Sequence, residues 1–202
     1  MKVLLGTRNP HKLAELKRVL GEISGIEWVD FHSVPFPEVA ETGETLEENA
    51  KLKALAIARA TGLPTLAEDT GLEVFALGGA PGVRSARFAG EQKDYQANNE
   101  KLLRLLEGVV DRRARFRAVA ALALPDGRLW STEGVLEGEI AHVARGEGGF
   151  GYDPLFIPIG ERRTLAEMTP EEKDAISHRR RALERMRPLL SSLAQGELQK
   201  PA

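Results

Sequence analysis

The chain has 202 residues, of which 42% are hydrophobic and 29% charged, a composition typical of a globular protein rather than a disordered one. Its formal net charge of −2 argues against a sequence-blind nucleic-acid binder, which needs a basic surface. Because there is no cysteine, disulfides, zinc–thiolate sites and cysteine nucleophiles are excluded. No apolar run approaches the roughly 18 residues of a membrane span, and the first residues do not resemble a signal peptide. We therefore expect a cytoplasmic protein without a membrane or nucleic-acid partner.

The N-terminal segment predicts a strand followed directly by a helix. Val3–Leu5 is an apolar run, and Asn9 can cap a helix that has Pro10 at its first position. Leucines at three- and four-residue spacing then give this helix one apolar face. Residues 7–12 are thus interpreted as a strand-to-helix turn. The free backbone N–H groups at such a helix start favour an anion.

A second strand and a second helix are expected next. The strand lies near Glu27–Phe31 and is followed by a loop over residues 33–44. Thr45 and Glu48 form a capping-box pattern, which predicts the start of a helix, and Gly62 is a typical helix end.

The second half of the chain contains more strands. Glu68 to Gly71 is interpreted as an acidic turn between two short strands, and Asp94 as the cap of a helix that ends near Glu107. The remaining expectations are a hairpin around Pro125-Asp126-Gly127, a glycine-rich loop in "GEGGFGYDPLF", a helical turn from Thr169 and a long last helix capped by Ser177. Alternating strands and helices followed by a hairpin predict an α/β protein with a mixed sheet.

Two motifs are set aside. Gly146–Gly151 matches G-x-G-x-x-G, but prolines at 154 and 158 follow it, so it cannot open the helix that a dinucleotide site requires. The four histidines show no metal-ligand spacing.

The candidate site residues fall into basic and acidic clusters. The basic and hydroxyl clusters are Thr7 with Asn9 and Lys12, Lys53 with Asn49, and Lys173 with Ser177, His178 and Arg179. The acidic residues are Glu38, Glu41 and Glu44 in the loop and Glu68 with Asp69. Taken singly, the lysines could be surface residues and the acids could serve solubility or a turn.

The placement of these clusters favours a ligand site. Thr7 and Glu68 each follow an apolar strand, and ligands of open α/β sheets bind outside the carboxyl ends of strands. Cations for a phosphate and oxygen ligands for Mg²⁺ or Mn²⁺ would meet there. "GGFGYDP" offers Phe150 for stacking on a nucleobase, although Phe150 and Tyr152 could equally be core residues.

Five motifs, taken together and in order, resemble the inosine triphosphate pyrophosphatase family. They are "T-x-N-x-x-K" at the first turn, "ETGETLEENAKLKA", "AEDTGLEVFALGGAPGVRSARFAG", "GGFGYDPLF" and "EEKDAISHRRRAL". The resemblance covers about residues 3–190. It implies hydrolysis of deaminated purine nucleoside triphosphates (ITP, dITP and XTP) to the monophosphate and pyrophosphate. It also implies a homodimer and a two-lobed α/β fold over residues 1–195, with an elongated mixed sheet, flanking helices and an active cleft between the lobes. Residues 196–202 are expected to be a frayed tail.

The resemblance assigns a role to each matching position. The phosphate side would consist of Thr7, Arg8, Asn9, Pro10, His11, Lys12 and Lys53, with Thr70 also touching substrate. The base and sugar would be held by Phe150, Gly151, Tyr152, Asp153, Lys173, His178 and Arg179. Asp69 would be the catalytic proton acceptor and, with Glu41, would bind Mg²⁺.

Some alternatives stay open at this point. Glu38 and Glu44 compete with Glu41, which only the match to "ETG" selects, and Glu68 stands where many relatives have a second aspartate. The chain could prefer another modified base, or it could be a non-catalytic nucleotide sensor.

Overall fold

The computed structural model describes residues 1–198, and within them six strands form one sheet. The sheet order is β2-β1-β3-β4-β5-β6. The strands are β1 (Lys2–Leu5), β2 (Glu27–Val29), β3 (Thr65–Val74), β4 (Arg113–Ala123), β5 (Leu129–Ile140) and β6 (Phe156–Pro158). β1 pairs in parallel with β2 and β3, whereas β5 and β6 are antiparallel. The predicted mixed sheet is therefore confirmed.

The helices begin and end close to where their capping residues predict. They are α1 (Pro10–Leu20), α2 (Leu46–Thr61), α3 (Tyr95–Leu105), α4 (Pro170–Ile176) and α5 (His178–Ala194). Thr45 caps α2 by accepting from the N–H of Glu48, and Gly62 ends the helix with φ of 72°. The capping box is only half formed, because the Glu48 carboxylate accepts from the N–H of Glu44.

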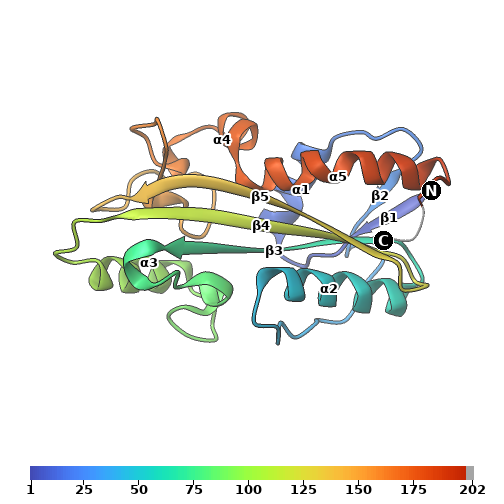
Figure 1. The fold of residues 1–202 in the computed structure, drawn as a ribbon, viewed down its shortest axis with the longest axis horizontal. Coiled ribbons are helices and arrows are strands. Elements are labelled where there is room, and N and C mark those ends of the chain that lie inside the picture. The colour runs from blue at the N-terminus through green and yellow to red at the C-terminus, as the bar shows by residue number, and fades with distance from the viewer. Residues whose placement is uncertain (199–202) are drawn as a thin grey trace. The chain divides into compact units, whose positions relative to one another are not determined.

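The chain forms two compact units. The first contains Met1–Asp69, Ala118–Gly134 and the chain from Arg179 onward. In this unit α1 and α5 cover one face of the strands and α2 covers the other (Figure 1). Leucines of α1 and α5 pack with Leu66 in one apolar cluster, while alanines of α2 pack with Ala67 in another. Each sheet face in this unit thus has its own helix layer.

The second unit contains Thr70–Arg117 and Val135–His178. Its core joins apolar residues from β3, α3, β4 and β5 to those around the short strand β6. Phe156 is fully buried and packs on Phe116 with ring centroids 4.5 Å apart.

The predicted acidic turn at Glu68 to Gly71 is wrong. β3 runs without interruption from Thr65 to Val74, so both carboxylates lie inside a strand. The sequence suggested a turn because acidic residues and glycine are uncommon within strands. The strand tolerates the carboxylates because cationic side chains of the same unit surround them, as described below.

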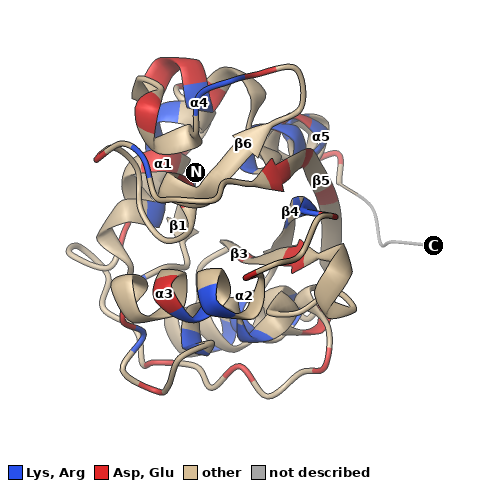
Figure 2. Cartoon of the chain, turned by 90° about the vertical axis from the view of Figure 1, so that its left-hand side faces the viewer, with Lys and Arg blue, Asp and Glu red and all other residues tan. Residues whose placement is uncertain are grey.

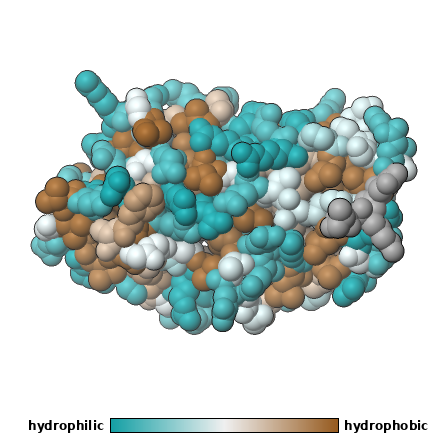
Figure 3. Space-filling view, in the orientation of Figure 1, coloured by the Kyte–Doolittle hydropathy of each residue, from teal (hydrophilic) through white to brown (hydrophobic). Residues whose placement is uncertain are grey.

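The face drawn in Figure 3 carries several brown, apolar areas with hydrophilic residues between them. None of the described helices is long and apolar enough to span a bilayer. Of the predicted frayed tail, residues 199–202 lie outside the described part of the chain, and Leu198 accepts a hydrogen bond from Arg128.

Candidate active site

The strand-to-helix turn after β1 is built around Asn9. The Asn9 side chain accepts hydrogen bonds from the N–H groups of His11 (2.9 Å) and Lys12 (3.3 Å), and its own N–H donates to the Thr7 hydroxyl at 3.1 Å. Pro10 occupies the first helical position, where no N–H donor is needed. The predicted cap is therefore confirmed, and it fixes the backbone from which Lys12 projects.

Glu68 and Asp69 point to opposite faces of β3. Successive side chains of a strand alternate between its faces. Leu66 belongs to the cluster under α1 and α5, so Glu68 points toward these helices, whereas Ala67 and Asp69 point toward α2. β1 pairs with β3 only as far as Leu66, so both carboxylates lie just beyond the carboxyl end of β1. This arrangement brings them close to the turn that carries Lys12.

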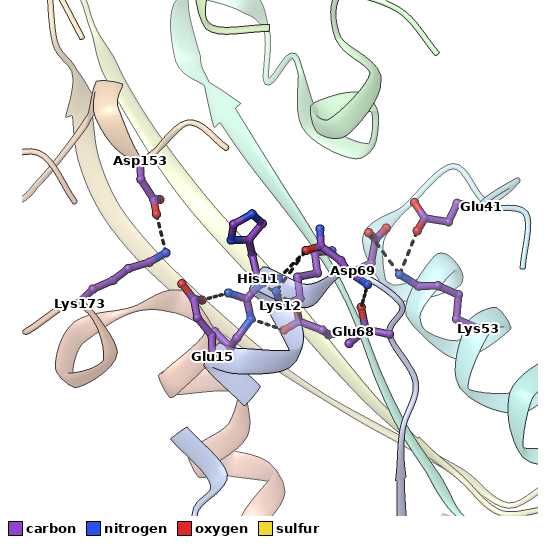
Figure 4. Close-up of polar contacts among 12 residues, drawn as sticks. His11, Lys12, Glu15, Glu41, Lys53, Glu68, Asp69, Asp153 and Lys173 are labelled. Carbon is purple, nitrogen blue, oxygen red and sulfur yellow. Dashed lines mark hydrogen bonds and ion pairs between the residues drawn. The ribbon is translucent and has the colours of Figure 1, made fainter. Parts of the chain in front are cut away.

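Asp69 shares a lysine with Glu41. Lys53, on α2, lies 3.0 Å from Glu41 Oε1 and 3.9 Å from Asp69 Oδ1. Asn49, one turn earlier on α2, also hydrogen-bonds Asp69. Figure 4 shows Lys53 reaching toward both carboxylates and Lys12 close to Glu68 and Asp69. Burial raises the pKa of Asp69 above its ordinary value, although Lys53 and Lys12 act in the opposite direction.

Lys12 stands among charges of both signs. Burial and the positive charge of Lys53 lower its pKa, and the carboxylates of Glu68 and Asp69 oppose this shift. The ammonium groups of Lys12 and Lys53 repel each other, and an anionic ligand between them would relieve that repulsion. The electrostatics of the turn therefore suit a polyphosphate.

Arg179 lies between two buried carboxylates. Its guanidinium donates to both oxygens of Glu68, at 2.8 and 2.6 Å, and to Glu15 on α1. Burial alone would raise the pKa of Glu68, but the charge and hydrogen bonds of Arg179 hold it below the ordinary value. Arg179 is only 1% exposed, so this ion triad is a structural centre of the first unit.

The residues around Asp69 fit a magnesium ion. Glu41 and Asp69 offer carboxylate oxygens, the ligand type that Mg²⁺ prefers, whereas the Asn49 oxygen accepts from the Gly43 N–H. Among residues 1–198, no group of three or more His, Cys, Asp or Glu side chains could hold a metal by itself. Such a partial site is usual for Mg²⁺, which binds through one or two carboxylates together with substrate phosphates and water. Glu41 is partly buried, whereas its rivals Glu38 and Glu44 are exposed.

The second unit holds its own group of predicted residues. Lys173 donates to Asp153 at 2.6 Å, and both residues are about as buried as the core, at 3% exposed each. The Lys173 ammonium also lies 4.8 Å from the centre of the Phe150 ring. Figure 4 shows the Asp153–Lys173 pair, and Figure 2 shows acidic and basic residues side by side on α4. A cation, a carboxylate and an aromatic face are thus grouped in one place.

Two other residues predicted for the base side are largely buried in this unit. Tyr152 packs in the core and its hydroxyl donates to the Ser85 carbonyl at 2.6 Å. His178 stacks on Phe116, with ring centroids 4.7 Å apart and planes 15° from parallel. His178 is the last residue of the second unit, and Arg179 the first of the returning first unit. The expected trio of Lys173, His178 and Arg179 is therefore divided between the two units.

The other predicted residues are more exposed. His11 and Arg8 are exposed, and the Arg8 guanidinium lies 4.7 Å above the Phe31 ring. Pro10 is exposed as well, and Thr70 is a partly exposed residue of β3. Gly151 lies in the loop before Asp153 with φ of 61°.

Sequence reasoning missed Glu15 and Phe116. Glu15 follows Lys12 by three residues, so the two lie on one face of α1, and this spacing was the available signal. Phe116 gave no signal, because an aromatic residue in an apolar strand is an ordinary core residue.

The solved Ham1 structures share this mixed α/β fold, and this chain belongs to the Ham1 family. The family model matches residues 3–189. This assignment confirms the resemblance to inosine triphosphate pyrophosphatases.

Relatives match over nearly their whole length. A dITP/XTP pyrophosphatase of Elusimicrobium minutum is 54% identical over 194 residues, covering 92% of this chain and 98% of the relative. One of Desulforamulus reducens is 52% identical over 196 residues, covering 96% and 97%. The solved structure of a HAM1 protein from Coxiella burnetii has a TM-score of 0.86 and 41% identity, covering 95% of this chain and 99% of that one.

Proposed function

We propose that this protein hydrolyses deaminated purine nucleoside triphosphates, namely ITP, dITP and XTP, to the nucleoside monophosphate and pyrophosphate. The observation that carries the proposal is the grouping of Lys12, Lys53, Glu41 and Asp69 around one point of the first unit. The relatives, which are named for this activity, support it.

The triphosphate would bind at the start of α1. The positive end of a helix dipole and a nearby ammonium group both favour phosphate oxygens. Lys12 lies on the first turn of this helix, and Lys53 approaches from α2. Both lysines would neutralise charge that grows on the departing pyrophosphate.

Asp69 would accept the proton of the attacking water. The water oxygen forms a bond to the α-phosphorus, the bond from that phosphorus to the bridging oxygen breaks, and pyrophosphate leaves with the electron pair. A base works best when its pKa approaches the working pH, and burial moves the pKa of Asp69 in that direction. Lys53 lies 3.9 Å from this carboxylate, and Asn49 hydrogen-bonds it.

We further propose that Glu41 and Asp69 hold Mg²⁺, with Mn²⁺ as a substitute. When bound, such an ion supplies a Lewis acid for phosphate oxygens and lowers the pKa of coordinated water. The oxygen-only ligand set around Asp69 supports this assignment.

The purine base would be recognised by the group around Asp153 and Lys173. Hypoxanthine and xanthine present a 6-oxo acceptor where adenine presents an amino donor. A pocket that offers donors such as His178 or backbone N–H groups would leave a donor facing a donor if ATP entered, at a cost of about 1–3 kcal/mol. Polar mismatch of this kind discriminates more strongly than size.

A substrate panel tests the proposal. The protein is incubated with ITP, XTP, ATP and GTP in the presence of Mg²⁺, and both products are identified. We expect monophosphate and pyrophosphate from ITP and XTP, and much slower release from ATP and GTP. Equal rates on all four nucleotides would remove the preference for deaminated purines but keep the hydrolase chemistry.

Two alternatives are answered by the same assay. A related pyrophosphatase with another modified-base preference would release pyrophosphate only from modified pyrimidines added to the panel. A nucleotide sensor would bind ITP without releasing pyrophosphate, and the buried Asp69 beside Lys53 argues against it.

We also propose that the protein is a cytoplasmic homodimer, as the family resemblance implies. Sedimentation equilibrium of the full chain tests the dimer, because a monomer mass at micromolar concentration would contradict it.

A further inference from the structure

The loop that carries Phe150 is shaped by glycines and by Asp153. Gly149 has φ of 66°, and a β-carbon there would overlap Asp153 Oδ2, so only glycine fits. The same Asp153 oxygen accepts from the Phe150 N–H at 3.1 Å and from Lys173 at 2.6 Å. These contacts hold the loop from the side of α4.

Helix α3 holds the loop from another side. Asn99 Nδ2 donates to the Gly151 carbonyl at 3.1 Å. Tyr95 lies one turn earlier on the same helix face, and its ring is 6.1 Å from that of Phe150 at an angle of 47°. The Phe150-Gly151 segment is therefore contacted on its ring by Tyr95 and on its backbone by Asn99.

Helix α3 is itself anchored firmly. Asn98, which is 2% exposed, accepts from the Ala89 N–H at 2.7 Å and donates to the Ala86 carbonyl at 3.0 Å. Lys101 donates to the Phe88 carbonyl at 2.6 Å. Because these bonds fix the helix to the segment before it, Tyr95 and Asn99 present a stable surface to the loop.

The hydrogen bond from Asn99 to Gly151 leaves the other polar atom of the Asn99 side chain without a partner within residues 1–198. Its Oδ1 is buried and has no hydrogen-bond donor among the described residues. Turning the amide over would not help, because Oδ1 would then face the Gly151 carbonyl. An apolar residue would avoid this penalty, so packing alone does not account for an asparagine here. The donor to Gly151 is the feature that distinguishes Asn99 from an apolar residue of similar size.

We propose that Asn99, supported by Tyr95, is a positioning residue that sets where Phe150 and Asp153 meet the purine base and thereby contributes to base selectivity. The inference rests on the proposed function, because it concerns the base side of that same site. It assigns no contact with the reacting phosphate to α3. Losing Asn99 should therefore affect recognition of the base and leave the binding of pyrophosphate unchanged.

The test compares Asn99→Asp and Asn99→Ala with Gln96→Ala. Asp is nearly the same size but lacks the donor, and Gln96 is an exposed amide on the same helix that bonds Glu100 instead of the loop. Pyrophosphate release from ITP and ATP gives kcat and KM, and calorimetry gives the Kd of IMP and of pyrophosphate. Circular dichroism and Tm confirm folding.

We expect both Asn99 variants to lose about tenfold in kcat/KM for ITP, mainly through KM, which is the scale of one hydrogen bond. IMP should bind about tenfold more weakly, pyrophosphate equally well, and the preference for ITP over ATP should narrow. Gln96→Ala should match the unaltered protein. If the Asn99 variants do not fold, Tyr95→Leu provides the same comparison at a partly exposed position.

Asn99 variants that keep the KM for ITP and the selectivity of the unaltered protein would overturn the inference. An equal loss of IMP and pyrophosphate binding would also overturn it, since that result indicates general damage. If the unaltered protein releases no pyrophosphate from any nucleotide, the proposed function itself fails and this inference fails with it.

Discussion

Glu68 and Asp69 are adjacent carboxylates with opposite pKa shifts. Both are about 4% exposed, but Glu68 is paired with a guanidinium through two hydrogen bonds, while Asp69 has a lysine at 3.9 Å. For Glu68, the two hydrogen bonds and the charge of Arg179 outweigh burial, so its pKa is lowered. For Asp69, the more distant Lys53 does not outweigh burial, so its pKa is raised. Carboxylates whose environments separate their pKa values are usually assigned different roles. This difference agrees with a structural role for Glu68 and with the proposed role of Asp69 as proton acceptor.

Asp69→Asn should remove activity without loss of stability. We expect pyrophosphate release from ITP to fall at least about a hundredfold, the usual scale for a general base. The free energy of unfolding should stay the same or rise, because burial disfavours the charged carboxylate. Steady-state assays and urea denaturation measure the two effects.

Asp126→Asn is the matched control, since Asp126 is an exposed residue of the β4–β5 turn that pairs with Arg128. It should change neither quantity. Near-normal turnover in Asp69→Asn would exclude Asp69 as the catalytic base.

Arg179→Leu should be strongly destabilising, whereas Arg180→Leu should not. Removing Arg179 leaves Glu68 and Glu15 buried without their cation, which typically costs about 3–5 kcal/mol. Arg180 makes a partly exposed helical pair with Glu184, which contributes about 0.3–0.5 kcal/mol. Urea denaturation of both variants at pH 7 gives the comparison, and similar losses would contradict a structural role for the triad.

The pH dependence of this difference follows from Glu68. The pKa of Glu68 is lower in the folded protein than its ordinary value of 4.5. The stability that the Glu68–Arg179 pair contributes is therefore fully present above about pH 4.5 and is lost as the pH falls through the pKa of the folded state. The gap in unfolding free energy between the unaltered protein and Arg179→Leu should therefore shrink in acid. A gap that stays constant from pH 7 to pH 3 would show that Glu68 is not the carboxylate responsible.

At the scale of elements, the start of α1 combines a helix cap with the proposed binding site of the triphosphate. The Asn9 side chain accepts from the N–H groups of His11 and Lys12, so the Lys12 ammonium is the donor of this turn that could meet a ligand. In the proposed site Asn9 would serve both the stability of the helix and the binding of the triphosphate, and substitutions can separate the two.

Asn9→Ala should cost about 0.5–2 kcal/mol of stability, whereas Asn9→Asp should cost little because aspartate also caps helices well. Aspartate, however, places a negative charge where the triphosphate would bind. We expect KM for ITP to rise in both variants, and in Asn9→Asp without a matching loss of Tm. If KM followed Tm in both variants, Asn9 would act only as a cap.

At the scale of the whole molecule, each compact unit has a hydrophobic core of its own. The buried contacts that the structure describes in residues 1–198 are apolar clusters and ion pairs, such as those of Arg179 with Glu15 and Glu68. Metal should therefore matter to the reaction and not to the fold.

Removal of divalent metal with EDTA should abolish pyrophosphate release and shift Tm by less than about 2 °C. Activity should return on addition of Mg²⁺ and, in part, of Mn²⁺. A large drop in Tm with EDTA would reveal a structural metal, and full activity in EDTA would rule out the proposed magnesium site.

The sequence by itself determined the family, the mixed α/β class and most helix boundaries, because these depend on local signals. Asn9, Thr45, Asp94 and Gly62 cap helices through bonds to residues within four positions, so their roles can be read along the chain. The candidate site residues were also named from sequence, through motif and resemblance.

Only the tertiary structure decided which of those residues meet. It placed Glu68 and Asp69 inside a continuous strand, which sends them to opposite faces. It paired Arg179 with Glu15 across 164 positions of the chain and stacked His178 on Phe116. Such contacts depend on burial and on charges that come from distant segments. A local pattern cannot contain them, because the energy that makes a buried carboxylate tolerable in a strand is supplied by a cation from another element.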